Sequence, residues 1–150
     1  MAEIRFHTLN AAGGGARFRH ACKLIEQAYL AGERVLVWLD DPGTSERFDQ
    51  LLWTFRDGAF VPHEPLAEAG NSEAPVQLFS GDTLGSTVLD GGFTTLVNLR
   101  DAPSPEALGF PRILEVLDGE ASCREAGRAR FRFYREAGST PQHIAVTDED

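Results

Sequence analysis

The sequence predicts an α/β fold: a single three-layer domain in which helices cover both faces of a mostly parallel central sheet. Short apolar runs alternate along the chain with segments of helical periodicity, and this alternation is typical of parallel strands joined by helical crossovers. The run Arg34–Leu39 is almost entirely apolar, as expected of a central strand that is covered on both faces. The length of 150 residues suits one domain.

The first half of the chain contains two strands, each followed by a helix. The first strand, residues 4–9, alternates between apolar and polar side chains. The glycines of residues 13–15 turn the chain, and the apolar residues of 16–30 then recur at spacings of three and four, which predicts a helix. The second strand, residues 34–39, leads through a turn into a second helix that ends near Phe55.

The second half is richer in loops. Two prolines fix a loop at residues 58–66, and the polar residues 68–74 predict an exposed segment. Further apolar runs predict strands at residues 75–79, 94–99 and 112–117, before a last helix over residues 121–138. We assign residues 1–140 to one Rossmann-like domain and residues 141–150 to a flexible acidic C-terminal tail.

The charge of the chain changes sign near its end. Fourteen basic and 23 acidic residues give a net charge of −9, yet residues 121–138 hold five arginines and only two acids. That segment carries +3 and the remainder −12. Phosphate attraction supplies most non-specific affinity for nucleic acid, so direct nucleic-acid binding is not expected of so acidic a chain.

The last helix has an arginine face with an aromatic ring in it. On a wheel of about 100° per residue with Arg124 at zero, Arg128 lies near 40°, Arg132 near 80°, Arg135 near 20° and Phe131 near 340°. We expect the opposite arc, near 200°, to face the core. It is formed by Ala126, Phe133 and Ala137, with Cys123 and Tyr134 nearby. Arginine pairs with carboxylates and stacks on rings, so this face predicts a site for an acidic peptide with an apolar or aromatic end. A plain solvated basic face is the alternative interpretation.

Two other features of the sequence suggest further functional sites. The turn Gly13–Gly15 precedes a helix, and Asp40 follows the second strand, so together they could form a nucleotide-binding enzyme site. Phe18 stands where that motif needs a small residue, and a plain turn is therefore the favoured interpretation. Trp53 and Phe60 lie at a helix end and in a proline-fixed loop, where aromatic side chains serve either as protein-contact anchors or as core.

No pattern of residues predicts a cofactor or a metal site. The four histidines lie in separate segments without ligand spacing, and no cysteine pair has the spacing of a metal knuckle. Cys22 and Cys123 stand far apart and are expected to be buried thiols. The chain contains no apolar run of the ~18 residues that a membrane span needs.

Six short motifs, spread over most of the chain, occur in the same order in one known family. They are Arg34-Val-Leu-Val, Leu52-Trp53 leading to Phe60-Val-Pro-His63, Ala74-Pro-Val76, Leu96-Val-Asn-Leu99, Phe110-Pro-Arg-Ile-Leu-Glu-Val116 and Arg128-x-Arg-Phe-x-Phe-Tyr-Arg-x-x-Gly138. In these motifs the chain resembles the chi subunit of bacterial DNA polymerase III. The segment from Trp53 to His63 and the last helix are the most specific parts of the likeness.

The resemblance implies a non-catalytic adaptor in the bacterial cytoplasm that acts in DNA replication. Such a subunit joins the clamp loader through the psi subunit and binds the acidic, Phe-ending tail of single-stranded DNA-binding protein (SSB). Carried over by position, the likeness implies that Trp53 and Phe60 face psi, or a helicase-like repair protein that competes with psi. It places the SSB tail at Leu117, Arg124, Arg128, Phe131 and Arg132.

Overall fold

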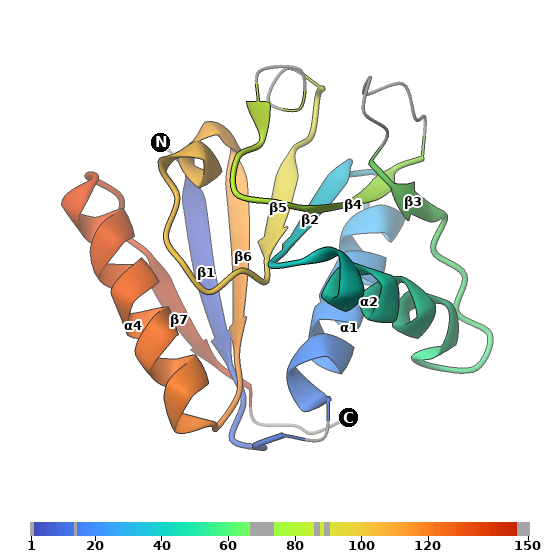
Figure 1. The fold of residues 1–150 in the computed structure, drawn as a ribbon, viewed down its shortest axis with the longest axis horizontal. Helices are drawn as coiled ribbons and strands as arrows, with labels where there is room; N and C mark the ends of the chain where they lie inside the picture. The colour runs from blue at the N-terminus through green and yellow to red at the C-terminus, as the bar shows by residue number, and fades with distance from the viewer. Residues whose placement is uncertain (1, 14, 67–73, 86–87, 89–90, 147–150) are drawn as a thin grey trace.

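The computed structural model describes residues 2–13, 15–66, 74–85, 88 and 91–146, and it contains one seven-stranded sheet. All six strand pairings are parallel, in the order β3-β4-β2-β5-β6-β1-β7. The strands are β1 (Glu3–Thr8), β2 (Val35–Leu39), β3 (His63–Pro65), β4 (Val76–Ser80), β5 (Thr95–Asn98), β6 (Arg112–Leu117) and β7 (Gln142–Ala145). The predicted α/β class with a parallel sheet is confirmed (Figure 1).

Helices cover both faces of this sheet. Alternate residues of β2 point to opposite sides, so that Val35 and Val37 pack in one apolar cluster and Leu36 and Trp38 in another. The first cluster lies under α1 (Ala16–Leu30) and α2 (Pro42–Thr54). The second lies under α4 (Ala121–Glu136) and the short 3-10 helix η1 (Pro105–Gly109). The three predicted layers are therefore present.

The two edge strands differ from the sequence prediction. β7 lies within the range 141–150 that we assigned to a tail, and β3 lies within the predicted loop 58–66. An edge strand pairs on one side only, and both strands are short and largely exposed, so neither carries the apolar pattern that marks an inner strand. Residues 147–150 and most of the segment 68–74 lie outside the described residues.

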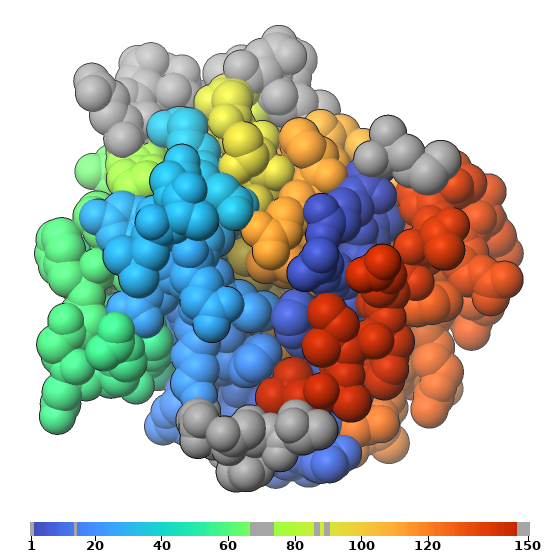
Figure 2. All heavy atoms as spheres, turned by 180° about the vertical axis from the view of Figure 1, so that it is seen from behind, coloured from blue at the N-terminus to red at the C-terminus, as the bar shows by residue number. Residues whose placement is uncertain are grey.

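β7 pairs with the beginning of the chain. His143 lies opposite Phe6 and Ala145 opposite Thr8, and the backbone N–H of Val146 donates to Thr8 O at 2.9 Å. Seen from behind, β1 (dark blue) and β7 (red) lie side by side (Figure 2). This long-range pairing completes the face of the sheet next to α4. Among the described residues, none of the helices has the length and apolar character needed to cross a bilayer.

Candidate functional site

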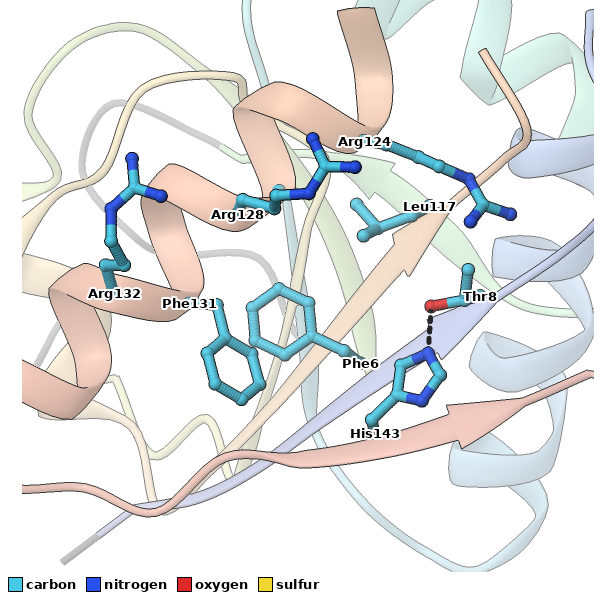
Figure 3. A pocket seen from close by; sticks show the side chains of 9 residues that line it. Phe6, Thr8, Leu117, Arg124, Arg128, Phe131, Arg132 and His143 are labelled. Carbon is cyan, nitrogen blue, oxygen red and sulfur yellow. Dashed lines mark hydrogen bonds between the residues drawn. The ribbon is translucent and has the colours of Figure 1, made fainter. Parts of the chain in front are cut away.

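A pocket of about 260 Å³ lies between α4 and the strands β1, β6 and β7 (Figure 3). Its lining includes all five residues predicted for the acidic-peptide site: Leu117, Arg124, Arg128, Phe131 and Arg132. It also includes Phe6, Thr8, Gly127 and His143, which sequence reasoning missed. The fold thus brings the arginine face of the last helix together with the edge of the sheet formed by β1 and β7.

The floor of the pocket is apolar. Phe6 of β1 and Leu117 of β6 face α4 and belong to the cluster beneath it. The ring of Phe131 packs against that of Phe6, with centroids 5.2 Å apart and planes inclined at 54°. Phe131 is half-buried, so one part of its ring contacts the core and another lines the pocket. An apolar side chain could therefore be held between two aromatic rings and a leucine.

Three guanidinium groups are spread along the rim of the pocket, on the side formed by α4 (Figure 3). Arg128 and Arg132 are exposed, and neither side chain has an ion pair or hydrogen bond to any other described residue. Arg124 is fixed instead: its Nε donates to Asp118 O at 3.0 Å and its Nη2 to Leu9 O at 2.9 Å. Because the charges lie in a row, they suit an extended acidic chain better than a single anion.

His143 and Thr8 close the pocket on the side of β7. The ring atom Nε2 of His143 lies 3.0 Å from Oγ1 of Thr8, within hydrogen-bonding distance. No sequence signal marks these two residues or Phe6, because their meeting depends on the pairing of β1 with β7. Gly127 did carry a signal, since glycine within a helix costs about 1 kcal/mol relative to alanine and therefore calls for a structural reason.

The buried face of α4 differs from the predicted arc of Ala126, Phe133 and Ala137. Ala126 and Phe133 are only half-buried and Ala137 is exposed, whereas Gly127, Arg130 and Tyr134 are buried. Tyr134 was expected beside the predicted arc, and its burial is confirmed. The rest of the prediction was wrong because it treated every arginine as a surface residue. Arg130 instead pairs with Glu115 of β6 inside the protein, at 2.9 Å. Burial disfavours its charge, but the charge of Glu115 and the hydrogen bond to it outweigh that effect and raise the pKa of Arg130.

The second predicted surface, formed by Trp53 and Phe60, lies at the opposite edge of the sheet, beside β3. Trp53 and Phe60 are 44% and 64% exposed, and their ring centroids are 6.0 Å apart. Trp53 also packs against the buried ring of His63 in β3, with centroids 4.3 Å apart and planes inclined at 41°. These aromatic rings are therefore a supported, solvent-facing pair rather than core. β3 and β7 are the opposite edges of the sheet, so this surface and the pocket are far apart (Figure 1).

The geometry does not favour the alternative nucleotide site. Gly15 begins α1 with a positive φ of 80°, and exposed Asp40 accepts a hydrogen bond from the backbone N–H of Asp101 at 3.2 Å. A polar pocket of about 270 Å³ lies at this edge of the sheet, yet none of Gly13, Gly15 and Asp40 lines it. Its lining holds three carboxylates and one arginine, and consists of Arg17, Asp101, Asp118, Glu120, Ser122 and Cys123. Phosphate groups would be repelled there.

The two thiols are shielded from solvent to different degrees. Cys22 is buried as predicted, and burial raises its pKa to about 12. Cys123 is only partly buried, and burial raises its pKa as well. In the described parts of the chain, no three histidine, cysteine or acidic side chains come together as metal ligands would.

Comparison with known proteins agrees with the resemblance read from the motifs. Residues 1–142 match the family model of the DNA polymerase III chi subunit, HolC. The DNA polymerase III subunit chi of Pseudomonas aeruginosa is 36% identical over 138 residues, which cover 92% of each chain. The Escherichia coli protein of the same name is 28% identical over 117 residues, which cover 78% of this chain and 77% of its own.

A solved structure shows the same fold at low sequence identity. The crystal structure of T4 UvsW superposes with a TM-score of 0.63 at 10% identity, and covers 96% of this chain. This chain spans 42% of the length of that one, and the likeness concerns the fold alone. The family match and the relatives decide the identity: the chain belongs to the family of DNA polymerase III chi subunits, which are accessory subunits of DNA replication.

Proposed function

We propose that this chain is a non-catalytic adaptor that links the clamp-loader complex, through psi, to the acidic C-terminal tail of SSB. The observation that carries the proposal is the combination, in one pocket, of an apolar floor with two arginines whose side chains have no partner among the described residues. Unpaired guanidinium groups beside an apolar cavity match a ligand with carboxylates and a terminal aromatic ring.

The tail is expected to enter the pocket with its terminal phenylalanine first. That ring would pack between Phe131, Phe6 and Leu117, where burying a phenylalanine contributes about 1.5–3 kcal/mol. The terminal carboxylate would pair with Arg128, whose planar guanidinium can donate two parallel hydrogen bonds. The preceding aspartates would follow the rim past Arg132. Arg124 contributes charge rather than a bidentate pair, because its Nε and Nη2 already donate to backbone carbonyls.

The aromatic pair Trp53 and Phe60 is the proposed contact with psi. Exposed aromatic side chains held on a rigid support are frequent anchors of protein interfaces. Because β3 and β7 are opposite edges of the sheet, psi and the SSB tail could be bound at the same time, as an adaptor requires. A helicase-like repair protein that uses the same aromatic pair would compete with psi and leave the tail pocket free.

Fluorescence anisotropy with a labelled SSB-tail peptide tests the proposal. Arg128→Ala should weaken binding by about 1–3 kcal/mol, the range for a hydrogen bond to a charged group. Arg135→Ala is the matched control: it removes an arginine from the same helix, but one that does not line the pocket. Equal affinities for the wild type and Arg128→Ala, or an equal loss in the control, would remove the pocket from the proposed function.

A further inference from the structure

Gly127 lies directly over Leu117 at the floor of the pocket. A Cβ atom built at position 127 would lie 2.5 Å from Cδ1 and 2.6 Å from Cδ2 of Leu117, far inside contact distance. Gly127 has no positive φ, so the helix backbone does not itself require glycine there. Glycine is among the least favourable residues within a helix. The close approach of the leucine is therefore the reason why position 127 lacks a side chain.

Leu117 occupies the space that Gly127 leaves. It is the last residue of β6, faces α4 and is 8% exposed. Both residues line the pocket, with α4 on one side of the leucine and the cavity on another. A methyl group at position 127 would displace the end of the leucine side chain, and the room available to it is the cavity. A larger residue at position 127 would therefore push Leu117 into the cavity and make the pocket shallower.

We propose that Gly127 and Leu117 together form the specificity determinant that sets how large an apolar terminal side chain the pocket accepts. This inference rests on the proposed function, because it concerns the last side chain of the same acidic peptide. The arginines at the rim would pair with the carboxylates of the peptide. The apolar floor therefore discriminates between terminal side chains. Phe6 and Phe131 provide its aromatic surfaces, and Leu117 limits its depth.

The test compares two labelled acidic peptides that differ only in their last residue, phenylalanine or alanine. The wild type should prefer the Phe-ending peptide roughly tenfold or more, because it buries the larger apolar side chain. Gly127→Ala should reduce this preference to within about threefold while the binding due to the arginines persists. Gly127→Ala combined with Leu117→Val should restore the preference, because valine is shorter and vacates the space that the new methyl group takes. Ala129→Gly alters helix propensity in α4 away from the pocket and should leave the preference unchanged.

Each outcome decides between the proposals. If neither peptide binds to the wild type, the proposed function itself is wrong. If the wild type binds but shows equal preference, or if Gly127→Ala keeps the wild-type preference, the role of the pair is overturned and the proposed function stands. If Gly127→Ala fails to fold, Leu117→Val alone replaces it in the test, because the smaller valine side chain creates no new clash. It should deepen the floor and raise the affinity for a Trp-ending peptide relative to the Phe-ending one about threefold, and no change would overturn the role of the pair.

Discussion

Arg130 and Glu115 form an ion pair beneath α4 in which both side chains are almost completely buried, at 1% and 0% exposure. Nε of Arg130 donates to Oε1 of Glu115 at 2.9 Å, and the other carboxylate oxygen accepts from Tyr134 Oη at 2.7 Å and from Asn98 Nδ2 at 2.9 Å. The carboxylate therefore joins β5, β6 and α4. It fixes the helix in the rotation that directs Arg128 and Arg132 toward the pocket.

Glu115→Ala should lower the free energy of unfolding by about 3–5 kcal/mol, because removing one partner leaves Arg130 as a buried, uncompensated charge. Urea denaturation followed by circular dichroism measures this change. Tyr134→Phe is the matched variant: it removes one hydrogen bond to the same carboxylate and should cost about 1–3 kcal/mol. A loss below about 1 kcal/mol for Glu115→Ala would show that the ion pair does not hold α4 in place.

Binding of the SSB tail should weaken as salt concentration rises. Arg128 and Arg132 are exposed, and charges in solvent are screened over about 8–10 Å at ordinary ionic strength. Anisotropy titrations between low and high salt should give a steep dependence for the wild type and a shallower one for Arg128→Ala with Arg132→Ala. A tail peptide whose aspartates are replaced by asparagines should show a shallower dependence in the wild type, because only its terminal carboxylate remains charged. Identical salt dependence of the two proteins would mean that these arginines do not face the peptide.

The part of the site on α4 could be predicted because it depends on one helical period. Arg124, Arg128, Phe131 and Arg132 fall on one face at spacings of three and four, and the structure places all four along the same pocket. The central strands could be predicted for a similar reason. The run 34–39 is apolar throughout, and every residue of β2 is buried.

The rest of the site depends on contacts between residues far apart in sequence. Phe6 and His143 meet only because β7 pairs with β1, and β7 is an exposed edge strand without an apolar pattern. The buried face of α4 was misplaced for a related reason. Arg130 can be buried only opposite Glu115, and neither residue type signals burial when it is read alone.

Phe60→Ala should separate the two proposed surfaces. Phe60 is 64% exposed, so its loss should change the free energy of unfolding by only about 0.5 kcal/mol or less. As an interface anchor, it should weaken psi binding by about 2 kcal/mol or more, measured by isothermal titration calorimetry. Affinity for the SSB-tail peptide should stay at the wild-type value, and Arg128→Ala should show the reverse pattern. If Phe60→Ala binds psi normally, the aromatic pair is not the psi contact.

Acidification should destabilise the protein through His7, which faces His20 with ring centroids 5.6 Å apart. Burial, followed by the nearby His20, Arg5 and Arg112, lowers the pKa of His7 from 6.5 to about 4. Between these values the unfolded chain binds a proton at this position and the folded protein does not, so the free energy of unfolding falls as the pH drops from about 6.5 to 4. Because His7 is only half-buried, solvent screening limits the loss to about 1–2 kcal/mol.

Replacing His7 with asparagine removes the titrating group and should flatten this part of the stability profile. Urea denaturation of both proteins at pH 8, 7, 6 and 5 measures the effect, and the profiles should run parallel between pH 7 and 8, where the imidazole is neutral in both states. The stability of the variant should still depend somewhat on pH, because the pKa of His20 is also lowered. Burial is the main cause, and the charge of Lys23 adds to it. If the wild type and His7→Asn lose the same free energy between pH 7 and 5, His7 is not the group whose protonation opposes folding.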